Sequence, residues 1–156
     1  MKWTDSSKNG NKIISCLRKT SDFFNSLSDD HYTNRYFAIA QKISLESPMR
    51  ARVGACLIHP SGKIYSSINT RKTHPLVQKY CNKAVSRHAE INCIISCFRD
   101  RNYSLEGATL FVYRETRTQY LGRAKPCSLC YPVLKTLGIK KLYYTTLTGH
   151  TVEIIN

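Results

Sequence analysis

The sequence predicts a single mixed α/β domain, and two observations lead to this prediction. Segments whose apolar residues have helical spacing alternate with short runs rich in β-branched and aromatic residues. The chain has 156 residues, of which 42% are hydrophobic, and this is enough to bury one core. We expect residues 1–30 to form a polar extension with one short helix, and residues 31–156 to form the folded domain.

The first half of the chain shows these signals in order. A short helix is predicted from about Lys12 to Leu27, and Thr20-Ser21-Asp22 is a point where it could stop or restart. The spacing of apolar residues over 36–43 predicts the first long helix, which Ser47-Pro48 ends. Residues 53–59 and 63–69 have the pattern of two strands joined at Pro60-Ser61-Gly62, which predicts a hairpin.

Two short motifs in the second half carry the chemistry. His88-Ala89-Glu90 is followed at a distance by Pro126-Cys127-Ser128-Leu129-Cys130, which is the pattern H-x-E…P-C-x-x-C of zinc-dependent base deaminases. One imidazole and two thiolates suit a catalytic zinc ion with an open fourth position, so we predict His88, Cys127 and Cys130 as its ligands. Glu90 remains as the carboxylate that moves protons between water, ring nitrogen and leaving amine.

A helix is predicted behind each motif, over residues 90–98 and 130–137. Because a helix N-terminus favours negative groups, we expect it to ease ionisation of Cys127 and Cys130. A C-x-x-C pair can also belong to a structural zinc site or a redox pair, and Cys93 is the best candidate for a fourth structural ligand. Cys93 lies on the apolar side of its helix, so we expect a core residue instead.

Residues 36–146 resemble the cytidine and deoxycytidylate deaminase superfamily through these motifs. The resemblance implies a three-layer α/β/α sandwich around a mixed, roughly five-stranded sheet, with strands over 53–58, 104–112 and 138–144. Asn92, two residues after Glu90, is closer to the deoxycytidylate branch. A turn at 147–150 and a last strand at 151–155 predict a fifth strand antiparallel to the fourth, as in the cytidine branch.

The resemblance also implies substrate contacts. Asn69 would hold the sugar, although Asn is also a common turn residue, and the backbone N–H of Ala89 would bind a carbonyl of the base. Arg71 and Lys72, in the loop before the zinc motif, are candidates for a phosphate. His74 and Cys81 are a weaker candidate pair for a second, structural metal ion.

The connection over residues 114–125 is long and basic, so it is either the element that selects the substrate or a solvated excursion without a role. The net charge of +14, from 24 basic and 10 acidic residues, predicts an anionic substrate or partner. This charge would suit a single-stranded nucleic acid, with Tyr80, Tyr113 and Tyr120 stacking on bases. General basicity that aids solubility explains the charge equally well.

Seven cysteines, a polar start without a signal-peptide core and the absence of a long apolar run predict a soluble, cytoplasmic protein without a membrane partner. A homo-oligomer is an open alternative to a monomer. We predict a zinc-dependent hydrolytic deaminase that converts cytosine to uracil in a (deoxy)cytidine nucleotide, most closely dCMP. The alternatives are a deaminase of cytosine or adenine in single-stranded DNA or RNA, and a non-catalytic nucleic-acid-binding zinc module.

Overall fold

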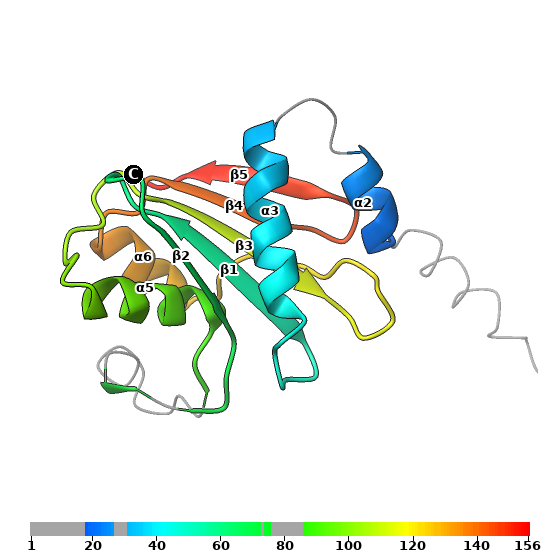
Figure 1. Ribbon diagram of the computed structural model, residues 1–156, viewed down its shortest axis with the longest axis horizontal. Helices are drawn as coiled ribbons and strands as arrows, with labels where there is room; N and C mark the ends of the chain where they lie inside the picture. Colours follow the sequence, from blue (N-terminus) through cyan, green and yellow to red (C-terminus); the bar gives the residue numbers. More distant parts are fainter. Residues whose placement is uncertain (1–17, 27–30, 73, 76–85) are drawn as a thin grey trace, which may run out of the picture.

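The computed structural model describes residues 18–26, 31–72, 74–75 and 86–156. In this part of the chain one sheet of five strands has the order β2-β1-β3-β4-β5 (Figure 1). Its strands are β1 (Arg52–Ile58), β2 (Ile64–Ile68), β3 (Thr109–Glu115), β4 (Lys141–Thr145) and β5 (His150–Ile154). β3 and β4 run parallel and the other neighbouring pairs run antiparallel, so the sheet is mixed as predicted.

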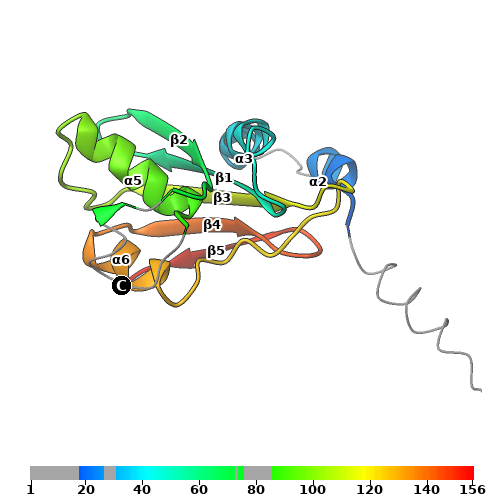
Figure 2. The ribbon, with the colours of Figure 1, turned by 90° about the horizontal axis from the view of Figure 1, so that it is seen from below.

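The helices divide between the two faces of the sheet. They are α2 (Thr20–Ser26), α3 (His31–Ser44), α5 (Ala89–Arg99) and α6 (Cys130–Thr136). Both ribbon views show α5 and α6 grouped together, apart from α2 and α3 (Figure 2). This is the three-layer α/β/α arrangement that the resemblance implied.

Side chains alternate along each strand and therefore build two separate cores. On β3, Leu110 and Val112 pack with α5 and α6, while Phe111 and Tyr113 pack with α3. Phe23 of α2 joins the second cluster and contacts Phe37 edge-on, with ring centroids 5.6 Å apart. Of the helix predicted over 12–27, the structure describes α2 from Thr20 to Ser26, and residues 12–17 and Leu27 lie outside the described part.

The helix predicted over 36–43 is confirmed as the centre of α3, which packs closely on β1. A Cβ atom added to Gly54 would collide with the backbone oxygen of Ala40 and lie 2.9 Å from the backbone nitrogen of Ser44. Only a residue without a side chain allows this approach. The contact fixes the start of β1 beneath the C-terminal end of α3.

The third strand differs from the prediction over residues 104–112. β3 begins only at Thr109, because a turn over residues 105–108, in which Gly107 has a φ of +81°, comes directly before it. β3 then continues to Glu115, where Arg52 of β1 lies opposite. The predicted final hairpin is confirmed: β4 and β5 pair antiparallel, and Thr146 N donates to Gly149 O at 2.8 Å.

No helix in the described ranges is both long enough and apolar enough to cross a membrane.

Candidate active site

The predicted metal ligands come together at the N-terminal ends of α5 and α6. One donor atom from each of His88, Cys127 and Cys130 lies within 4.8 Å of the others. His88 Nδ1 is 3.6 Å from Cys127 Sγ and 3.2 Å from Cys130 Sγ. Two segments 39 positions apart in the chain thus converge on one point.

The start of α5 is held by the end of the β hairpin. The backbones of Thr70 and Arg87 exchange two hydrogen bonds of 2.9 Å, which close the loop between β2 and α5. Asn92 Nδ2 donates to Ile68 O at 2.6 Å and ties the first turn of α5 to β2. His88, the residue that caps α5, is therefore fixed beside the last residues of the hairpin.

The three donors fit a zinc ion. With Zn–S of about 2.3 Å and Zn–N of about 2.0 Å in a tetrahedral site, nitrogen and sulfur ligands lie about 3.6 Å apart. The observed separations of 3.2 and 3.6 Å are close to this value. The set of one imidazole and two thiols leaves one coordination position for a small molecule, as catalytic zinc sites require.

The expectation that the helix N-terminus eases thiol ionisation is wrong for Cys130. Burial raises the pKa of the Cys130 thiol, and the nearby Glu90 carboxylate and Cys127 raise it further. Without metal the thiol is therefore the stable form, and binding of a cation provides the compensation that the thiolate needs.

Glu90 lies in the first turn of α5 and is 4% exposed. Burial raises the pKa of its carboxyl group, while a backbone N–H and the neighbouring His88 oppose the rise. A carboxyl group with a raised pKa beside a metal site can both accept and return a proton near neutral pH.

A cavity of about 240 Å³ opens in front of these groups, and we call it the His88 cavity. His88, Glu90 and Cys127 line it, together with Ala89 and Asn69. Its remaining lining residues come from the segment around the start of β1, from the end of β3 and from the connection that follows β3: Ala51, Val53, Arg114, Arg123, Ala124 and Lys125.

Asn69 is buried and its side chain is held on three sides. Its Oδ1 accepts hydrogen bonds from Ser47 Oγ at 2.6 Å and from Val53 N at 3.0 Å. Its Nδ2 donates to Ala51 O at 2.9 Å, and the second N–H of that amide is left for a ligand. Sequence reasoning did not find Ser47, because its only visible signal was the helix-ending pair Ser47-Pro48.

The connection over 114–125 is built into the fold. Leu121 is buried against the α3 side of the sheet. The Thr145 hydroxyl of β4 accepts a hydrogen bond from Arg114 N at 3.1 Å and donates one to Gly122 O at 2.8 Å. The connection therefore forms a fixed wall of the cavity, which argues against a solvated excursion.

Several predicted residues lie elsewhere. Arg71 and Lys72 are exposed and do not line the His88 cavity. Tyr113 is fully buried in the α3-side core, so the prediction that it stacks on bases is wrong. Tyr80 and Cys81 lie outside the described residues, which leaves the second metal pair untested, and Tyr120 is not among the lining residues.

Cys93 is a core residue, as expected. It is fully buried among the side chains between α5 and the sheet, and its thiol donates to Ala55 O at 3.3 Å. Among the described residues, the metal-binding group contains His88, Cys127 and Cys130 without it.

Comparison with known families agrees with this geometry. A profile of the cytidine and deoxycytidylate deaminase zinc-binding region matches residues 28–146. The chain belongs to this deaminase family. Its members are hydrolases that act on C–N bonds, and the zinc-binding region contains the His88, Cys127 and Cys130 cluster. A search of curated proteins found no match.

Solved structures show that the deaminase shares its fold with proteins of low sequence identity. It is similar to dCMP deaminase from the cyanophage S-TIM5, with a TM-score of 0.56, 23% identity and coverage of 76% of this chain and 85% of that one. It is similar to cytidine deaminase from Burkholderia pseudomallei, with a TM-score of 0.56, 17% identity and coverage of 81% and 94%. It is also similar to cytidine deaminase from Mycobacterium tuberculosis, with a TM-score of 0.54, 17% identity and coverage of 78% of this chain and 89% of that one.

Proposed function

We propose that this deaminase hydrolyses cytosine to uracil and ammonia in a (deoxy)cytidine nucleotide, with dCMP as the model substrate. The observation that carries the proposal is the His88 cavity itself. It is lined by two members of the His88, Cys127 and Cys130 cluster, by the buried carboxylate of Glu90 and by three cationic side chains. This is the arrangement that a cytosine ring joined to an anionic group would need.

Glu90 is the proton carrier in this proposal. Zinc held by His88, Cys127 and Cys130 would supply the Lewis acid that activates water for attack on the ring carbon that bears the amine. The Glu90 carboxylate would take the proton released by that water. It would pass this proton to the ring nitrogen, then take the proton of the hydroxyl group added to the ring carbon and pass it to the amino group, so that the C–N bond breaks and ammonia leaves.

Ala89 and Asn69 would orient the base and the sugar. Ala89 is the first residue of α5, so its N–H has no acceptor within the helix and can bind a carbonyl of the base. Asn69 would donate its second amide N–H to a sugar hydroxyl. Because Ser47 and Val53 already hold its oxygen, the amide would be in position before substrate binds.

Arg114 and Arg123 are better placed for a 5′-phosphate than Arg71 and Lys72, since both line the cavity. Lys125 also lines it, but its ammonium group forms an ion pair of 2.7 Å with Glu153. An arginine side chain suits a phosphate because its planar group can donate two parallel hydrogen bonds. Support for a nucleotide comes from the cyanophage S-TIM5 dCMP deaminase, a structural neighbour that was also solved in complex with dCMP and dUMP.

The family assignment favours an enzyme over the non-catalytic zinc module. Cytoplasmic location and homo-oligomer formation stay predictions. A strand substrate is supported by a second basic cavity, which is described in the next subsection.

The test is ammonia release by zinc-loaded protein with cytidine, deoxycytidine, their 5′-monophosphates, adenosine and a cytosine-containing single strand. We expect turnover of cytosine substrates, with a lower KM for the monophosphates than for the nucleosides. The Arg123→Ala variant should raise KM for dCMP about tenfold and change KM for deoxycytidine little. If protein with one zinc per chain releases no ammonia from any of the cytosine substrates, the proposal is refuted.

A further inference from the structure

A second cavity of about 490 Å³ adjoins the His88 cavity, and we call it the arginine cavity. Arg50, Arg114 and Arg117 line it, together with Glu115 and two threonines of the turn after β3. Ala51 and Arg114 line both cavities. A ligand that enters the His88 cavity can therefore extend past Arg114 into the arginine cavity.

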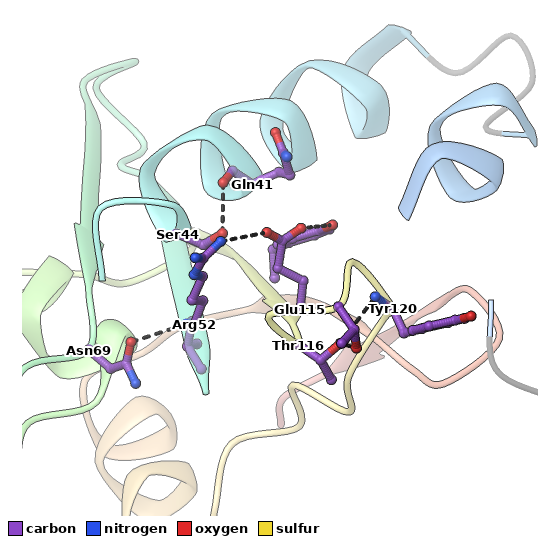
Figure 3. Close-up of polar contacts among 10 residues, drawn as sticks. Gln41, Ser44, Arg52, Asn69, Glu115, Thr116 and Tyr120 are labelled. Carbon is purple, nitrogen blue, oxygen red and sulfur yellow. Dashed lines mark hydrogen bonds and ion pairs between the residues drawn. The ribbon is translucent and has the colours of Figure 1, made fainter. Parts of the chain in front are cut away.

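The arginine cavity has excess positive charge. Within the described residues, none of its three arginines forms an ion pair. Glu115 is the one acidic residue among those that line it, and its carboxylate already has two partners. Arg52 Nη1 lies 3.7 Å from its Oε1 (Figure 3). The Tyr113 hydroxyl donates to its Oε2 at 3.1 Å.

Arg114 is held between the two cavities. Its side chain packs over Gly122, where an added Cβ atom would lie 2.8 Å from Arg114 Cγ. Its Nη1 donates to Arg123 O at 3.3 Å. A guanidinium group placed in this way can contact the anionic link between two adjoining units of a ligand.

The size of the arginine cavity indicates what it accepts. Its volume is about twice that of the His88 cavity, which has to hold a base and a sugar. A single phosphate would leave most of this space empty, whereas a neighbouring nucleotide with its phosphate would use it. The net charge of +14 also suits a ligand with several phosphates.

We propose that the arginine cavity binds the nucleotide next to the target cytidine in a single strand, with Arg50 and Arg117 on its phosphate. This inference rests on the proposed function and names its preferred substrate class. A free mononucleotide fills the His88 cavity alone, while a strand fills both cavities. The deaminase should therefore act on dCMP and act more efficiently on a short strand.

The first test compares kcat/KM for dCMP, dCTP and a pentanucleotide with one central cytosine. Wild-type protein should prefer the pentanucleotide over dCMP at least tenfold at low salt. Arg50→Ala and Arg117→Ala should each lower kcat/KM for the pentanucleotide about five- to tenfold and leave dCMP within twofold. Lys140→Ala is the matched control, because Lys140 is exposed just before β4, at the opposite end of that strand from Thr145 and the cavity walls.

Equal losses on dCMP and the pentanucleotide would overturn the inference, because they would place the arginines in the mononucleotide site. Losses on dCTP as large as those on the pentanucleotide would also overturn it, since they would assign the cavity to a 5′-polyphosphate. The inference is also overturned if Arg50→Ala and Arg117→Ala lower kcat/KM for the pentanucleotide no more than Lys140→Ala does.

The second test measures binding without turnover, by fluorescence anisotropy of a labelled pentanucleotide over a range of salt concentrations. Each lost phosphate contact should make the slope of log affinity against log salt shallower by about 0.7 for a single strand. Both arginine variants should show this change and Lys140→Ala should not. If binding follows this prediction while no substrate is deaminated, the proposed function fails and the proposed strand-binding site stands. If the slopes of the arginine variants are unchanged and dCMP is turned over normally, the proposed function stands and the strand-binding site is refuted.

Discussion

The His88 cavity and the arginine cavity share Ala51 and Arg114 but are built from different kinds of side chain. In the first, Glu90 and Asn69 are buried, and helix starts and hydrogen bonds fix their positions. In the second, Arg50 and Arg117 are exposed on connecting segments. Groups that carry out a reaction need fixed geometry, whereas groups that select a flexible anion work from mobile side chains.

This comparison predicts that substitutions have their largest effects in the cluster of His88, Cys127 and Cys130 beside the His88 cavity. Cys130→Ser should reduce bound zinc far below one per chain and lower turnover at least 1000-fold, because a hydroxyl group is a poor replacement for a thiolate. Metal analysis and ammonia release measure the two effects. The control is Cys93→Ala, which should keep its zinc because Cys93 is a core residue. Full zinc content in Cys130→Ser would contradict the assignment.

Asn69→Ala tests the wall of the same cavity. It should lower the free energy of unfolding by about 1–3 kcal/mol, because Val53 N and Ser47 Oγ lose their acceptor in a buried place. It should also lower kcat/KM for dCMP tenfold or more. Ser47→Ala provides the control, since it removes one of these two hydrogen bonds and keeps the proposed sugar contact. If the two variants lose activity equally, Asn69 acts only as a structural residue.

Glu115→Gln sharpens the comparison at the boundary of the arginine cavity. Removing this carboxylate takes away the acidic charge among the described lining residues, so affinity for the labelled pentanucleotide should rise about threefold. Stability should fall, because Arg52 and Tyr113 lose an ionised partner. Weaker binding by a folded variant would show that Glu115 does not oppose the anion.

The smallest effect, a change in stability, is expected at the ion pair between Lys125 and Glu153. The hydrogen bonds from Lys125 and from the Tyr144 hydroxyl hold the pKa of Glu153 below its ordinary value. The pair therefore stabilises the fold above pH about 4.3 and loses this contribution as the pH falls through the lowered pKa.

Glu153→Gln should accordingly reduce stability slightly at pH 6 and not at pH 3. Chemical denaturation of wild type and variant at both values measures the difference. A constant difference between the two proteins at both pH values would argue against a role for the charge.

The residues that the sequence predicts best are those whose chemistry depends on short spacing. His88, Glu90, Cys127 and Cys130 are recognisable because helix starts place residues two or three positions apart on the same site. The order of helices and strands can also be predicted from the sequence, because the spacing of apolar residues indicates which face of each element is buried. The final antiparallel hairpin follows from its turn.

Contacts between distant segments leave no such signal. The Ser47 hydroxyl reaches Asn69 across 22 positions, and the carboxylate of Glu115 meets Arg52 through pairing of β1 with β3. From its basic neighbours, Tyr113 is predicted as an exposed aromatic residue. In the structure, the alternation of side chains along β3 directs it into the core. The start of β3 was misplaced because Ala108 and Leu105 are buried without belonging to a strand.

The central claim is that Glu90 moves protons on a zinc-dependent hydrolytic site. Measuring ammonia release from dCMP together with zinc content, for wild type and Glu90→Gln, tests it most directly. We expect one zinc per chain in both proteins, and turnover about 100- to 10,000-fold lower in the variant. Comparable turnover in the zinc-loaded variant, or loss of its zinc, would contradict the role given to Glu90.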